Sequence, residues 1–115
     1  MIRVKRVYEP PSPDDGYRVL IDKLWPRGLS KERARLDEWL RKEAVSDELR
    51  KWFGHEPEKW NEFRAKYMKE LDAHREELRN LLRQTRGKNL TILYAAKDEE
   101  HNNAVVLKEY LEELE

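Results

Sequence analysis

The sequence predicts one small three-layer α/β domain over residues 1–115, with a mostly parallel sheet and helices on both of its faces. The continuous apolar runs at 19–21 and 90–94 are typical of strands that are covered on both sides. Between and after these runs, apolar residues recur at steps of three and four, the spacing of amphipathic helices. Strands and helices in this order favour helices packed on a parallel sheet.

Three segments are predicted to be strands. Residues 2–7 alternate apolar and basic side chains, which indicates a strand near a sheet edge. A loop rich in proline, closed by Asp15-Gly16, separates it from a second strand at 17–24. The third strand covers 89–95.

The helices are predicted from their caps as well as from their periodicity. Ser30 and Ser46 are suitable N-caps, and Gly54 is a suitable left-handed helix end. The predicted helices cover 31–43, a short segment between Ser46 and Gly54, one long or two successive helices from 57 to about 86, and 102–114.

The charge balance argues against a nucleic-acid partner. The chain has 24 basic and 24 acidic residues, so its formal net charge is zero, whereas nucleic-acid binders usually carry a basic excess. Residues 97–115 carry two bases and seven acids, which makes the last helix a poor surface for a duplex. Residues 1–27 carry a small surplus, six bases against four acids.

The absence of cysteine excludes disulfides, thiolate nucleophiles and cysteine–zinc sites. No apolar run reaches the ~18 residues of a membrane span, and the N-terminal segment lacks the apolar stretch of a signal peptide. The sequence therefore predicts a cytoplasmic protein without a membrane partner. It indicates no particular cofactor and leaves the oligomeric state open.

Two polar motifs follow the two apolar strands, at 22–28 and 95–103. Open α/β sheets place ligands beyond the carboxyl ends of their strands, so parallel neighbouring strands would bring both motifs to one rim. The sequence therefore predicts a site at the carboxyl ends of the strands at 17–24 and 89–95.

Three residues of these motifs are candidates for acid–base chemistry: Asp22, Asp98 and His101. Asp22 interrupts an apolar strand, where a carboxylate is costly unless it is paired or hydrogen-bonded. The structural alternative for Asp22 is an ion pair or a bond to backbone amides, and for His101 a capping or ion-pairing role.

The predicted ligand-binding residues share the ability to hold an anion or to form the wall of a pocket. Arg27 lies between proline and glycine, so its guanidinium has a restricted direction, and the start of a helix favours anions. The set is Arg18, Trp25, Arg27, His55, Lys97, Asn102 and Asn103, and no metal ligand is predicted.

The function that this pattern favours is binding of a small anionic ligand, phosphate- or nucleotide-like, with acid–base groups that would also suit a hydrolase or a transferase. Whether the chain is an enzyme stays open. No Gly-rich phosphate loop, dinucleotide turn or nucleophile elbow is present. The alternative function is a non-catalytic interaction module that binds protein or nucleic acid through the basic N-terminal region. A third reading makes both motifs purely structural.

Three stretches resemble the YeaO-like family, which contains domain of unknown function 488: YRVLIDKLWPRGL at 17–29, WFGHEP at 52–57 and YAAKDEEHNNAVVL at 94–107. The resemblance covers essentially the whole chain. It implies a small three-layer α/β fold and a cytoplasmic location, and it implies no particular substrate.

Longer members of the wider family carry a cysteine-containing form of the third motif, roughly Leu-Cys-Ala-Glu followed by Cys-His-Arg. The matching positions here are Tyr94, Ala96, Asn102, Asn103 and Ala104. Every reactive side chain of that form is replaced, so thiol chemistry of the same kind is not expected of this chain.

Overall fold

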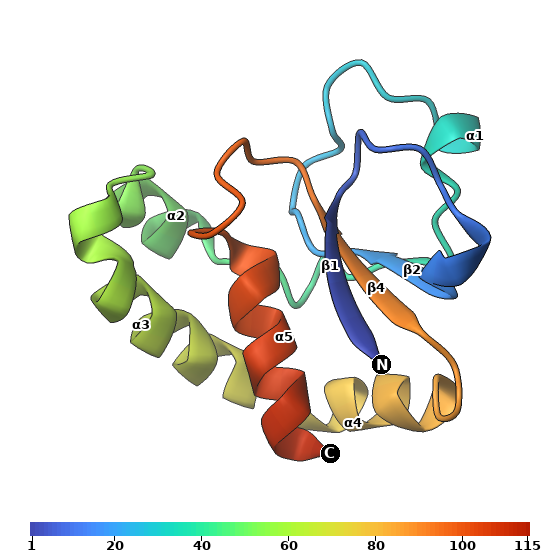
Figure 1. Cartoon of the computed structure of the whole chain (residues 1–115). Coiled ribbons are helices and arrows are strands. Elements are labelled where there is room, and N and C mark those ends of the chain that lie inside the picture. The colour runs from blue at the N-terminus through green and yellow to red at the C-terminus, as the bar shows by residue number, and fades with distance from the viewer.

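The computed structural model describes all residues, 1–115, and shows a four-stranded parallel sheet (Figure 1). The predicted α/β fold class with a parallel sheet is therefore confirmed. The strands are β1 (Ile2–Arg6), β2 (Tyr17–Leu20), β3 (Glu38–Trp39) and β4 (Leu90–Tyr94), in the spatial order β1-β4-β2-β3. β4 pairs with β1 on one side and with β2 on the other, so the two apolar strands are parallel neighbours.

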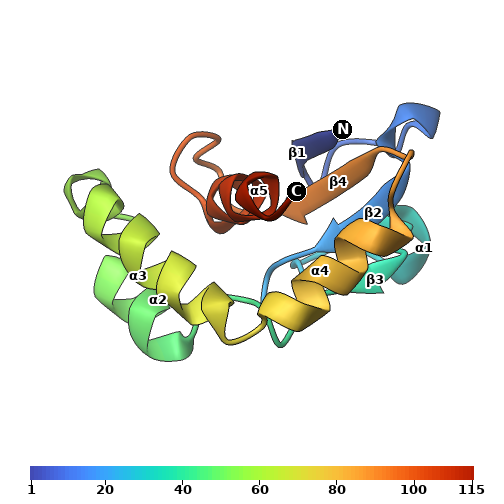
Figure 2. The ribbon, with the colours of Figure 1, turned by 90° about the horizontal axis from the view of Figure 1, so that it is seen from below.

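The two faces of the sheet are covered differently. Val19, Ile92 and the other side chains of one face join a core of twenty buried residues with the longer helices. These helices are α2 (Asp47–Phe53), α3 (Trp60–Asp72), α4 (Arg75–Gln84) and α5 (Asn103–Leu114). The opposite face is covered by connecting segments that contain the 3₁₀ turn η1 (Pro13–Asp15) and the one-turn helix α1 (Lys31–Ala34). Figure 2 shows α5 and α1 on opposite sides of the sheet.

The predicted helix at 31–43 is wrong beyond its first turn. Ser30 caps α1 as expected, but the helix ends at Arg35, whose φ is 46°. Continuation would need the carbonyl oxygens of Ala34 and Arg35 as acceptors, and both instead accept bonds from the buried guanidinium of Arg18. The chain after Arg35 is then free to pair with β2 as β3.

The other helix ends agree with their predicted caps. Ser46 accepts a bond from the backbone of Leu49 at the start of α2, and Gly54 ends that helix with φ of 53°. The long segment after residue 57 forms a 3₁₀ turn, η2 (Pro57–Lys59), and two successive helices, α3 and α4. Asn102 caps α5. None of these helices combines the length and the apolar character that crossing a membrane requires.

The predicted strand at 17–24 is shorter than expected, and this matters for the site. β2 ends at Leu20, and Ile21 still donates to the carbonyl of Leu93 in β4. Residues 22–24 then leave the sheet, which turns Asp22 toward the start of α5 instead of leaving it in the ladder.

Candidate functional site

A cavity of about 240 Å³ lies beyond the carboxyl ends of β2 and β4. Segments that are far apart in the sequence form its wall: the chain after β2, helices α2 and α3, and the segment between β4 and α5. Five of the predicted site residues line it, and the complete lining is Asp22, Val45, Arg50, Phe53, His55, Phe63, Ala96, His101, Asn102 and Asn103. The two predicted motifs therefore meet at one opening.

Asp22 is the acidic group of this cavity, and it has no cationic partner. Its two carboxyl oxygens accept from the backbone N–H of Ala95 at 2.8 Å and from Nδ2 of Asn103 at 3.0 Å. Burial raises the pKa of Asp22 above its usual 3.8, and these two neutral donors offset only part of that rise. The cavity therefore contains a carboxyl group whose charge is incompletely compensated.

The start of α5 holds two amide side chains beside this carboxyl. The buried Asn102 accepts from the backbone of Val105 at 3.0 Å and donates to the carbonyl of Asp98, so its orientation is determined. Asn103 bonds to Asp22 through its amide nitrogen and to the backbone of Ala104 through its oxygen. Asn103 thus connects the end of β2 to the first turn of α5.

His101 lines the cavity and is oriented by two neighbours. Its Nδ1 lies 3.0 Å from the carboxylate of Asp98, and its ring meets Trp60 edge-on at 5.2 Å between centroids. Asp98 itself is exposed, and the backbone N–H groups of His101 and Glu100, together with the imidazole, lower its pKa. Asp98 therefore positions His101 from outside the cavity.

The end of α2 contributes Arg50 and His55 to the mouth of the cavity. Both are exposed, and the guanidinium of Arg50 reaches Asp47 at 3.5 Å. His55 has a φ of 57°, one of only two non-glycine residues with positive φ in the chain. This left-handed conformation costs a side-chain-bearing residue roughly 1–2 kcal/mol, and such strain tends to be kept where it serves a function.

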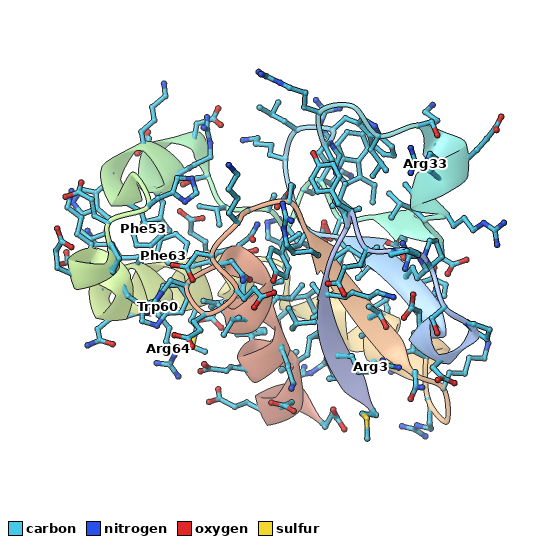
Figure 3. All side chains as sticks on the ribbon, turned by 45° about the horizontal axis from the view of Figure 1, so that its top comes forward. Arg3, Arg33, Phe53, Trp60, Phe63 and Arg64 are labelled. Atoms are coloured by element: carbon cyan, nitrogen blue, oxygen red, sulfur yellow. The ribbon has the colours of Figure 1, made fainter.

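Phe53 and Phe63 form the aromatic wall of the cavity, and Trp60 packs on them without lining it. Phe53 from α2 stacks on Phe63 from α3 with centroids 4.3 Å apart, and Trp60 stacks on Phe63 at 5.6 Å. Figure 3 shows these three rings together between the two helices. The cavity thus combines an apolar wall with a few polar groups, which is the usual composition of small-molecule sites.

Five predicted site residues lie away from the cavity wall. Arg18 is buried on the opposite face of the sheet, where its guanidinium reaches the carboxylate of Asp15 at 2.5 Å, and it is not available to a ligand here. The indole N–H of Trp25 donates to the carbonyl of Leu29. The remaining three, Arg27, Lys97 and Asp98, are exposed.

The basic N-terminal strand, on which the alternative interaction hypothesis depends, uses its cations within the chain. Arg3 donates to the carbonyl of Asp14, Lys5 pairs with Asp15, and Arg6 donates to the carbonyls of Ala95 and Ala96. These bonds attach the first strand to its neighbours, and of its three cations only Lys5 is paired with a carboxylate.

Five residues of the cavity lining lie outside the predicted set: Val45, Arg50, Phe53, Phe63 and Ala96. Phe53 and Phe63 follow helical periodicity, which indicates buried positions but does not separate a cavity wall from the core. Arg50 is one arginine of many, and no local pattern separates it from the others. No three side chains of the types that bind metals come together in a group able to hold an ion.

By its fold, the chain is a small α/β protein with an all-parallel sheet and a cavity beyond its strand ends. It matches, over residues 1–115, the family described as "Inactive DUF488-N3 subclade", and it belongs to that family. The predicted membership of the YeaO-like group is thereby confirmed.

Two relatives illustrate the match. The uncharacterized protein YeaO of Escherichia coli K12 is 43% identical over 113 residues, which cover 98% of each chain. The uncharacterized protein Rv3073c of Mycobacterium tuberculosis H37Rv is 41% identical over 112 residues, covering 96% of this chain and 92% of the relative. No solved structure matches the chain significantly.

Proposed function

We propose that this protein binds a small phosphate-bearing ligand of the nucleotide type in the cavity between β2, β4 and α5, without transforming it. The observation that carries the proposal is the polarity of the cavity. A carboxyl group without a cationic partner lies inside, whereas an arginine and two histidines, Arg50, His55 and His101, belong to the same lining.

The aromatic side of the cavity suits a planar heterocycle. Phe53 and Phe63 offer an apolar wall, and Asp22 offers carboxyl oxygens to N–H donors. A nucleobase has both an aromatic ring and N–H groups, so its edge would complete the bonding of Asp22. The volume of about 240 Å³ is small, and it suits one base better than an extended ligand.

The cationic side suits a phosphate. The guanidinium of Arg50 is permanently charged and can form two parallel bonds to a phosphate. His55 and His101 add charge when they are protonated. The proposed nucleotide would therefore bind with its base toward Asp22 and its phosphate toward Arg50.

The lining contains no cysteine, serine or threonine, so it lacks a thiol or hydroxyl nucleophile. Ala96, Asn102 and Asn103 occupy positions where the cysteine-containing cousins carry their third motif. The family's description as inactive agrees with binding in the absence of a reaction. Binding without turnover is the simplest function compatible with these residues.

Calorimetric titration with nucleoside monophosphates, the matching nucleosides and inorganic phosphate tests the proposal. A monophosphate is expected to bind more tightly than its nucleoside, and Arg50→Ala should weaken the monophosphate at least about tenfold, the effect of losing a charged bond. Arg27→Ala is the matched control, since Arg27 is exposed but lies outside the cavity. If none of these compounds binds at millimolar concentration, or if both variants weaken binding equally, the proposal fails.

A further inference from the structure

A second hollow lies at the opposite end of the sheet from the candidate site. It has a volume of about 470 Å³ and is formed by α4, the turn at 85–88, the N-terminus and the end of α5. Figure 1 shows both chain termini beside α4 at this end of the molecule. Its apolar surface includes Leu82, Leu114 and Met1, and Met1 is 84% exposed.

Four cationic side chains surround this apolar surface: Arg79, Arg83, Arg86 and Lys88. Arg79 pairs with Glu76, but no carboxylate forms an ion pair with the other three. The backbone nitrogen of Met1 lies 3.5 Å from the carbonyl oxygen of Lys88 at the edge of this hollow. We call this hollow the basic groove.

The end of α5, which forms one side of the basic groove, carries the opposite charge, and Glu115 belongs to the groove lining. Glu112 and Glu115 are exposed, and neither forms an ion pair. Unpaired cations and unpaired carboxylates therefore lie side by side on a chain whose net charge is zero.

From this arrangement we infer that the basic groove binds a second copy of the chain in a symmetric dimer. A two-fold rotation brings the same surface patch of both copies together. It would place the acidic end of each α5 against the basic groove of its partner and would cover Met1 and Leu114 of both copies. An extended polyanion fits less well, because the carboxylates of α5 flank the groove and would repel it.

The dimer would leave the candidate cavity open, since the groove and the cavity share no lining residue. The inference is therefore independent of the proposed ligand.

Light scattering coupled to gel filtration, across a concentration series at low and high salt, tests the inference. The wild-type chain is expected to be dimeric at low salt and to dissociate as salt rises, because the contacting charges become screened. Arg83→Glu/Arg86→Glu and, separately, Glu112→Lys/Glu115→Lys should each weaken the dimer at least about tenfold by placing like charges together. Lys31→Glu/Arg33→Glu on the exposed α1 is the control for charge reversal and should leave the dimer intact.

Mixing the two reversed variants provides the decisive arm. In the Arg83→Glu/Arg86→Glu variant both the groove and the end of α5 carry acidic residues, and in the Glu112→Lys/Glu115→Lys variant both carry basic residues. The mixture should therefore form a one-to-one dimer, although neither variant dimerises alone. Formation of the dimer in the mixture also shows that both variants are folded. A wild-type chain that is monomeric at every concentration overturns the inference. So does a dimer that the reversals leave unchanged, a mixture that stays monomeric, or a monomer that binds heparin through Arg83 and Arg86.

Discussion

The chain holds two inward-facing aspartates, one on each side of the sheet, and their surroundings differ. Asp15 is fully buried, and its carboxylate contacts Lys5 at 3.1 Å and Arg18 at 2.5 Å. Asp22 has only the backbone N–H of Ala95 and the amide of Asn103. Both carboxyl groups are shielded from water, but only Asp15 has cationic side chains beside it.

The pKa values of the two groups follow from this difference. For Asp15, burial by itself would raise the pKa, but the N–H of Ser12 and the two cations lower it below 3.8 in total. For Asp22, burial prevails and the pKa is raised. The cations around Asp15 are therefore part of the fold, whereas the incompletely compensated Asp22 is the carboxyl that the proposed ligand would contact.

The largest change in stability is expected from removing a cation that compensates Asp15. Arg18→Met removes the closest cation from Asp15 and also the donors to the carbonyls that end α1, so unfolding free energy should fall by about 3 kcal/mol. Urea denaturation measures it. Arg33→Met, at an exposed position of α1, should stay within about 0.5 kcal/mol of wild type. A loss below about 1 kcal/mol for Arg18→Met would show that the buried pair is not essential to this face.

On the cavity side, Asp22→Asn should affect binding more than folding. The amide oxygen can still accept from the backbone of Ala95, but the bond from Asn103 is lost. Because the cost of the buried charge disappears at the same time and offsets that loss, the unfolding free energy should change by less than about 1 kcal/mol. Affinity for a nucleoside monophosphate should fall about tenfold, because an acceptor for the base is lost. A variant that loses more than about 2 kcal/mol of stability and keeps its affinity would assign Asp22 to the structural group.

A smaller change in stability is expected from relieving backbone strain at the cavity and on the opposite side of the sheet. His55 and Arg35 are the two non-glycine residues with positive φ, at 57° and 46°, one at the cavity and one behind the sheet. Either residue changed to glycine should gain about 0.5 kcal/mol in thermal denaturation, because glycine adopts this conformation without strain. Only His55→Gly should also weaken ligand binding. Equal affinities in the two variants would remove His55 from the site.

The smallest effect is the opposite titration of the two aspartates, followed by NMR of their side-chain carboxyl carbons. Asp22 should titrate above 3.8 and Asp15 below it. A raised pKa means that the folded state holds the proton more tightly, so the stability from Asp22 is complete below 3.8 and is lost as pH rises through its folded pKa. The stability from Asp15 is present above 3.8 and is lost as pH falls through its folded pKa. Midpoints in the reverse order would contradict the comparison.

Much of the fold could be predicted because its signals are local. The apolar runs of β2 and β4, the caps Ser46 and Asn102, and the left-handed end at Gly54 each depend on a few adjacent residues. The meeting of the two motifs followed from one general rule on parallel strands. The predicted helix over 31–43 was wrong where β3 forms, because the buried Arg18 of β2 bonds to the carbonyls of Ala34 and Arg35 that a longer helix would use.

Gly16 shows a further limit of local reasoning. It was placed correctly in a turn, but a side chain there would collide with the backbone carbonyl of Asn89, seventy-three positions away in the chain. The pairing of β2 with β4 thus requires glycine for a reason that only the folded chain reveals. The same holds for Arg50 and Phe63, which no local pattern connects with Asp22.

By itself, the sequence determined the class of fold, the position of the two apolar strands and most helix ends, because hydrophobic periodicity and capping act over a few residues. The tertiary structure alone decided which charges are balanced. Arg18 and Asp22 are four positions apart and would share one face of a continuous strand. Because the chain leaves the sheet after Ile21, Arg18 reaches Asp15 on one side, whereas Asp22 lines the cavity on the other. Electrostatic compensation depends on distances through space, and these exist only once the chain has folded.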